Sequence, residues 1–147
     1  MKKALLSFIC AFFTLTAYGA YDFQSGGLYY TITSTTNMTV KVSYNSNDKY
    51  TGGVYVIPPY VTYKDQRYYV TAIGSYAFSG CTNLTTIIFD DNTYVKTIGD
   101  YAFSGCNAMS SITIPASVTS IGNYAFSGCF TLKFVTIEDA TTTLSLG

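Results

Sequence analysis

The 147-residue chain contains no histidine and no tryptophan, and charged residues make up only 11% of it. Without histidine, neither a Ser-His-Asp nor a Cys-His catalytic arrangement can form, and zinc sites with histidine ligands are excluded as well. The 8 basic and 8 acidic side chains cancel in formal charge. A chain this close to neutral lacks the basic patch that binds nucleic acid or anionic lipid. We therefore expect no nucleic-acid partner.

The segment 1–20 has the three parts of a secretory signal. Two lysines at positions 2 and 3 form a basic start, an apolar run extends from Ala4 to Thr16, and small residues end the segment at 17–20. The run is too short for a membrane-spanning helix, which needs about 20 residues. Cleavage after Gly19 and cleavage after Ala20 both remain open. We predict a secreted or cell-surface protein with a net charge of −2 (6 basic and 8 acidic residues) and no membrane span in the mature chain.

A nine-residue motif occurs three times in the second half of the chain. It begins at Ile73, Ile98 and Ile121, so the copies start at intervals of 25 and then 23 along the chain (98 − 73 and 121 − 98). Each copy reads Ile-Gly, one variable residue, then Tyr-Ala-Phe-Ser-Gly-Cys, and two apolar residues at alternate positions follow it. Alternation is typical of a half-buried strand. This spacing predicts a coil in which every turn adds one strand to a parallel sheet and each unit is stabilised by its neighbours.

The extended pattern Ile-Gly-x-x-Ala-Phe-x-x-Cys-x-x-Leu-x-x-Ile-x-Ile-Pro resembles the BspA-type leucine-rich repeat of bacterial and protozoan surface proteins. The copy at 98–120 fits throughout except that Met109 replaces leucine, and the other copies have Asp90 and Glu138 where it has Pro115. The resemblance implies a leucine-rich-repeat solenoid with short parallel strands on its concave face. It also implies a role in adhesion to a host or neighbouring-cell protein.

We divide the chain into a signal peptide at 1–20, a β-rich N-terminal cap at 21–72 and three repeats at 73–97, 98–120 and 121–147. The cap is predicted to be small and antiparallel, and it would cover the apolar end of the first coil. Its tyrosines could alternatively form a recognition surface, since tyrosine suits interfaces. The last repeat is expected to be incomplete or truncated, with Leu144 in the position that Ile121 occupies in the repeat before.

Alternation along each strand assigns its side chains to the interior or to the concave surface. The inward pairs are Ile87 and Phe89, Ile112 and Ile114, and Val135 and Ile137. The outward residues, which we predict to bind the partner, are Thr86, Ile88, Ser111, Thr113, Phe134 and Thr136. The Tyr-Ala-Phe segments are predicted to form short helical turns on the convex wall, with an interior ladder of Phe78, Phe103 and Phe126.

Two groups of reactive side chains have both a structural and a functional interpretation. Cys81, Cys106 and Cys129 recur as a column, and a buried free cysteine behaves as a small apolar residue, although adjacent thiols could bridge. The acidic pairs at 90–91 and 138–139 fit solvated turns better than a calcium site or the paired carboxyls of a glycosidase, because no loop of acidic ligands surrounds them. We expect no catalytic residue, no cofactor and no metal.

The leading functional hypothesis is a secreted or cell-surface binding module without catalysis, which is adhesin-like and recognises a macromolecular partner through the strand face. The partner would be an extracellular or host protein, with a glycan as a second possibility. The alternative is a structural spacer in a longer surface protein, whose function would lie in a C-terminal part beyond this sequence. An enzyme would need a pocket and a charged constellation, and the sequence shows neither.

Overall fold

The computed structural model describes residues 21–45, 49–138 and 145–146, so the predicted signal peptide lies outside it. Within these residues the protein consists of strands joined by turns and contains no helix. None of its described segments is therefore a helix that could cross a membrane. The strands are β1 (Phe23–Ser25), β2 (Leu28–Ser34), β3 (Thr39–Val42), β4 (Val54–Ile57), β5 (Tyr60–Tyr63), β6 (Gln66–Ile73), β7 (Thr86–Phe89), β8 (Thr97–Ile98), β9 (Ser111–Ile114), β10 (Ser120–Ile121), β11 (Phe134–Ile137) and β12 (Ser145–Leu146).

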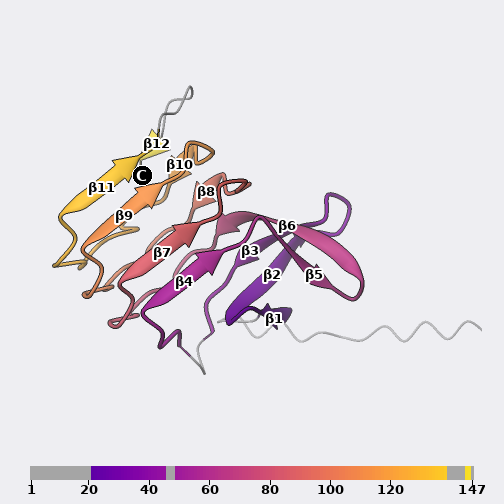
Figure 1. Ribbon diagram of the computed structural model, residues 1–147, viewed down its shortest axis with the longest axis horizontal. Coiled ribbons are helices and arrows are strands. Elements are labelled where there is room, and N and C mark those ends of the chain that lie inside the picture. Colours follow the sequence, from indigo (N-terminus) through magenta and orange to yellow (C-terminus); the bar gives the residue numbers. More distant parts are fainter. Residues whose placement is uncertain (1–20, 46–48, 139–144, 147) are drawn as a thin grey trace, which may run out of the picture.

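Four of these strands form one wall of a solenoid. Figure 1 shows β4, β7, β9 and β11 side by side, running in the same direction. β4 pairs with β7 and β9 pairs with β11 along their full lengths, both in parallel register, and β7 contacts β9 between the two pairs. Hereafter, "strand face" means the solvent side of these four strands. The three predicted repeat strands are therefore present, and β4 is a fourth that belongs to the section before the first Ile-Gly motif.

A second wall is formed by the short strands that lead into the start of each repeat. The end of β6 pairs in parallel with β8, β8 with β10, and β10 with β12. Ile73, Ile98 and Ile121 thereby stand in one row, and Leu146 is the next member because it pairs with Ile121. The prediction that Leu144 continues this row was wrong, because the residue that pairs with Ile121 is Leu146. Leu144 itself lies outside the described residues. The interval from Ile121 to Leu146 (146 − 121 = 25) equals the first repeat interval.

The N-terminal section extends this second wall. β1, β2 and β3 are joined by antiparallel pairing, and β5 and β6 form an antiparallel hairpin. The hairpin turn contains Lys64 and Asp65, both with positive φ (49° and 60°), as a two-residue turn of a twisted hairpin requires. β3, however, pairs with β6 in parallel. The section is thus a mixed sheet that continues directly into the repeats.

The third wall consists of tight turns instead of the predicted helical turns. In the first copy, the N–H groups of Tyr76, Phe78 and Gly80 donate to carbonyls of the next coil, at 2.7–2.9 Å. The N–H groups of Ala77, Ser79 and Cys81 donate to carbonyls three residues back in their own coil, at 3.0–3.2 Å. An α-helix needs successive N–H groups to donate within its own segment. Because every second donor is committed to the neighbouring coil, the segment cannot continue as a helix.

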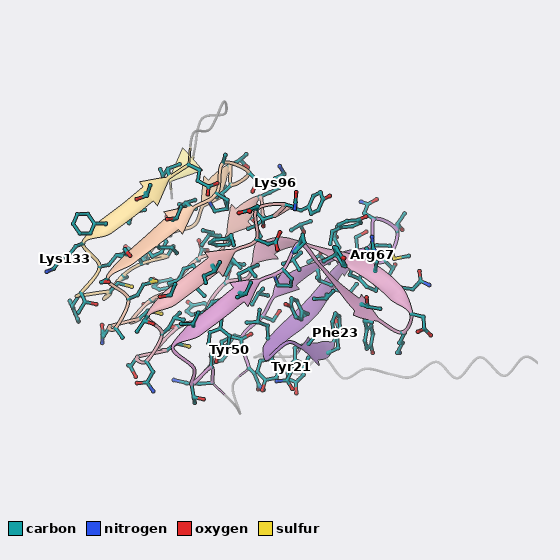
Figure 2. All side chains as sticks on the ribbon, in the orientation of Figure 1. Tyr21, Phe23, Tyr50, Arg67, Lys96 and Lys133 are labelled. Carbon is teal, nitrogen blue, oxygen red and sulfur yellow. The ribbon has the colours of Figure 1, made fainter. Side chains whose placement is uncertain are left out.

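Stacked columns of side chains fill the space between the walls. The predicted phenylalanine ladder is present: Phe78 and Phe103 are fully buried, and the ring centroids from Phe78 to Phe103 to Phe126 are 5.3 and 5.5 Å apart and nearly parallel. Tyr50 supplies the rung before Phe78, with its ring centroid 4.6 Å away. Its hydroxyl donates to the Ser43 carbonyl at 2.8 Å. Figure 2 shows Tyr50 between the N-terminal strands and the first coil.

Candidate functional site

The strand face carries two columns of outward side chains that cross the four strands. Pairing of β4 with β7 and of β9 with β11 aligns the first and third residue within each pair of strands, and β7 contacts β9 between the two pairs. One column contains Val54, Thr86, Ser111 and Phe134, and the other contains Val56, Ile88, Thr113 and Thr136. All six residues predicted from sequence to bind the partner lie here and are exposed. The structure therefore brings them together on one surface.

Val54 and Val56 belong to the same surface, although the sequence reasoning missed them. Their side chains are 56% and 53% exposed, which is unusual for valine on a well-formed strand. They escaped notice because no Ile-Gly-x-x-Ala-Phe motif precedes β4. The alternation within Val54–Ile57, followed by proline as in the middle repeat, was the available signal.

The chemistry of the strand face is neutral. Its apolar side chains are Val54, Val56 and Ile88 at one end and Phe134, which is 68% exposed, at the other. Hydroxyl groups occupy the middle, and those of Ser111, Thr113 and Thr136 have no hydrogen-bond partner within the described part of the chain. A surface with free hydroxyls between exposed apolar groups can satisfy both the backbone and the side chains of a bound polymer.

A small hollow of about 230 Å³ adjoins the strand face beside β4. Val56 lines it together with Leu28, Val61 and Tyr30, so it is mainly apolar. Tyr30 is fully buried, and its hydroxyl has no hydrogen-bond partner among the described residues. Burial also raises the pKa of this hydroxyl above its usual value. An unpaired buried hydroxyl costs free energy.

The far end of the strand row is less covered than the middle. Val135 and Ile137 are in register with Ile112 and Ile114, as the predicted inward pattern requires. They are nevertheless 49% and 47% exposed, whereas Ile112 and Ile114 are buried. The difference arises because β11 has a neighbouring front strand on one side only within the described residues.

The three cysteines of the repeats are free thiols that stack inside the solenoid. The Sγ of Cys106 donates to the Phe78 carbonyl at 3.2 Å, and the Sγ of Cys129 donates to the Phe103 carbonyl at 3.0 Å. Burial raises the pKa of Cys81 to about 11. Hydrogen bonding from Cys106 lowers the pKa of Cys129, which is the least buried of the three. The least buried thiol thus stands at the last of the three positions in the column.

The acidic residues that follow the strands take part in turns. An Asp90 carboxylate oxygen accepts the Asn92 N–H at 3.0 Å, and a Glu138 carboxylate oxygen accepts the Ala116 N–H at 3.3 Å. Asp139, the other half of the second pair, lies outside the described residues. Among the residues that the structure describes, no three His, Cys, Asp or Glu side chains gather as a group that could hold a metal ion.

Comparison with protein families gives one match. The family model described as "BspA type Leucine rich repeat region" matches residues 61–146 in six copies. A search of curated proteins finds no match.

Solved structures of leucine-rich-repeat proteins resemble the chain in fold. A Treponema pallidum leucine-rich-repeat protein, TpLRR, superposes with a TM-score of 0.60 at 22% identity over 77% of this chain and 48% of its own. The pneumococcal vaccine antigen PcpA gives a TM-score of 0.59 at 22% identity over 86% of this chain and 40% of its own. A leucine-rich-repeat protein from Bacteroides capillosus gives 0.55 at 26% identity over 80% of this chain and 98% of its own. The chain thus spans less than half the length of the first two.

Proposed function

Because the chain belongs to the BspA-type leucine-rich-repeat family, we propose that it is a non-catalytic binding module that recognises a macromolecular partner through the strand face. We further propose that the protein is secreted or displayed at the cell surface, with the segment 1–20 as its export signal and adhesion as its role. The basic start, short apolar run and small residues of that segment support this location.

The observation that carries the proposal is the composition of the strand face. Four of its eight outward side chains are exposed apolar residues, and the others are Thr and Ser. Exposed apolar side chains that gather on one surface mark interaction sites more often than scattered ones do. Val54, Val56 and Ile88 gather in this way across β4 and β7, because Val54 and Val56 precede Thr86 and Ile88 in their columns.

The neutral surface also indicates the chemistry of the partner. No charged side chain stands in the two columns, so attraction between charges contributes little and affinity should change little with salt. An extended protein segment fits best, because its peptide groups can bond to the central hydroxyls while its apolar side chains contact the ends. A glycan is the second candidate, since it would use the hydroxyls but leave the valines without a partner.

The N-terminal section serves, in this proposal, as the cap of the solenoid. The Tyr50 ring packs on Phe78 at an angle of 32°, and its hydroxyl bonds to two backbone groups of the section, accepting from the Tyr29 N–H at 3.0 Å and donating to the Ser43 carbonyl. The first coil would otherwise expose the face of a buried aromatic ladder. The section therefore covers the first coil and stabilises the end of the solenoid at which the strand face begins.

The test compares the wild-type chain with a double variant, Thr113→Lys and Thr136→Lys, against extracellular-matrix proteins, cell-surface glycans and whole cells. Both threonines are exposed on the strand face, so the variant should keep its fold while placing two charges on a neutral surface. Thr82→Lys with Thr97→Lys is the matched control, because these exposed threonines lie outside β4, β7, β9 and β11. Circular dichroism confirms that all three proteins fold.

Saturable binding that only the Thr113/Thr136 variant loses would support the proposal. Equal binding by all three proteins would move the site away from the strand face. If the folded wild type binds nothing in the panel, the spacer hypothesis gains, with function in a part of the protein beyond this sequence.

A further inference from the structure

A second cleft, of about 500 Å³, lies where the N-terminal section meets the first turn segment. None of its lining residues belongs to β4, β7, β9 or β11, so it is separate from the strand face. Lys41, Tyr44 and Lys49 line it from the N-terminal side, and Ser75, Tyr76 and Ser79 line it from the first coil. Its volume is within the range of small-ligand sites. We propose that this cleft binds an acidic saccharide, with the lysines on its carboxylate or sulfate and Tyr76 against its ring.

The charged side chains that line the cleft are both lysines. The described residues include six basic side chains, and two of them line this cleft, while no carboxylate lines it. Neither Lys41 nor Lys49 forms an ion pair within the described part of the chain. Both reach toward the first coil: a Cβ on Gly74 would lie 3.3 Å from the Lys41 Cδ, and one on Gly80 would lie 3.4 Å from the Lys49 Nζ. The aliphatic chain of Lys41 and the ammonium group of Lys49 therefore approach the first coil from the facing wall.

An aromatic ring is held in place beside these charges. Tyr76 has a φ of 59°, which is uncommon for a residue with a side chain, and its ring stacks on Tyr101 with centroids 5.0 Å apart and an angle of 5°. Tyr101 stacks in turn on Tyr124 at 5.2 Å. Tyr101 covers Tyr76 from the side of the next coil, whereas the N-terminal lining residues stand on the opposite side. The uncovered face of Tyr76 is therefore on the side of the cleft.

The remaining lining groups suit a polyhydroxylated ligand. Ser75 and Ser79 supply hydroxyls from the first coil, and Ser43 and Thr31 supply a hydrogen-bonded pair from the opposite wall, with their oxygens 2.6 Å apart. Phosphate alone would bind the lysines as point charges and would leave the hydroxyls and the tyrosine ring of this cleft without a role. The combination of point charges, hydroxyls and an apolar ring face matches an acidic sugar, which has an anionic group, hydroxyls and an apolar ring face.

The test is calorimetric titration of the full chain with three tetrasaccharides: hyaluronan, which carries carboxylates, chondroitin sulfate, which carries carboxylates and sulfates, and uncharged chitotetraose. We expect the two acidic sugars to bind and chitotetraose to bind at least about tenfold more weakly, since hydrogen bonds to charged groups are the stronger class. Lys41→Gln and Lys49→Gln should each lower the affinity for the acidic sugars by about tenfold. Lys133→Gln, which removes a lysine at the far end of the molecule beside β11, should change nothing (Figure 2).

A further variant, Tyr76→Asn, separates sugar recognition from simple anion binding. Asparagine accepts a positive φ, so the turn should persist while the ring is lost. The variant should bind the tetrasaccharides more weakly but bind inorganic sulfate as the wild type does. The proposal is overturned if no acidic sugar binds, if the lysine variants bind as the wild type does, or if sulfate or a polyglutamate peptide binds as tightly as the sugars. The strand-face proposal stands or falls independently, because its variants lie outside this cleft.

Discussion

Replacement of Phe103 by alanine should destabilise the protein more than the same replacement of Phe126, the next phenylalanine of the ladder. Phe103 is fully buried and its ring stacks on one ring in each adjacent coil, at 5.3 and 5.5 Å. A buried Phe→Ala change costs about 3–5 kcal/mol, and each lost ring pair adds about 0.5–1.5 kcal/mol beyond burial. With two ring pairs lost, the sum is about 4–8 kcal/mol. We expect about 4–5 kcal/mol for Phe103→Ala, because a measured Phe→Ala cost already includes part of the ring contacts. This is a large part of the stability of an ordinary domain.

Two other phenylalanines provide an internal scale for this value. Phe126 is only partly buried and stacks on one ring, so Phe126→Ala should cost about 2 kcal/mol. Phe130 is 89% exposed, so Phe130→Ala should stay within about 0.5 kcal/mol of wild type. Urea unfolding followed by circular dichroism and tyrosine fluorescence measures all three. If the free energy of unfolding falls equally for Phe103→Ala and Phe126→Ala, the ladder does not stabilise the solenoid by stacking, and the reasoning fails.

Three further predictions concern the close packing of coils and the buried ionisable groups. Gly99→Ala should lower the urea midpoint sharply, because a Cβ there would lie 2.5 Å from a backbone nitrogen of the preceding coil; Gly53→Ala, whose nearest contact would be 3.4 Å, is the control that should fold normally. Iodoacetamide at pH 7–8 should alkylate Cys129 before Cys81, since the pKa of Cys129 is lowered and that of Cys81 is raised to about 11; peptide mass spectrometry that finds Cys81 modified first would contradict this. Stability should fall between about pH 9 and pH 11, because the unfolded chain loses protons that the raised pKa values of Cys81 and Tyr30 retain in the folded state. A urea midpoint that does not change from pH 8 to pH 11 would refute this assignment.

The sequence was sufficient to predict those features that depend on repetition. Ile112 and Ile114 are buried and Ser111 and Thr113 are exposed, because a period of two on a strand leaves each side chain only one choice of face. The phenylalanine ladder followed from the same logic, since equivalent residues in stacked coils must meet. The six predicted strand-face residues gather on one surface for this reason, whereas their binding role stays a prediction.

Features that depend on backbone conformation were harder to predict. Tyr76 gives no sequence signal of a positive φ, as glycine or asparagine would, so the Tyr-Ala-Phe segments were expected to be helical. β4 was missed because its side chains alternate without the preceding motif. Leu144 was expected in the row of isoleucines, but strand pairing places Leu146 there; the glycine that follows Leu146 in the sequence repeats the Ile-Gly pair and was the available signal.

In the third wall, which consists of the tight turns, backbone N–H groups donate alternately to the next coil and to their own coil. This alternation fixes how residues of adjacent coils are aligned. In each of the first two turn segments, every second N–H points to the next coil and the others close turns within their own coil. A single residue inserted into such a segment would exchange the two sets, so that groups meant for the neighbour would face the turn and both sets would lose their acceptors. The loop from β7 or β9 to the next Ile-Gly pair has no such alternation of donors. Its length differs by two residues between the first and the second repeat interval. Variation in repeat length is therefore confined to that loop, while the turn wall fixes the number of residues from each isoleucine to its cysteine.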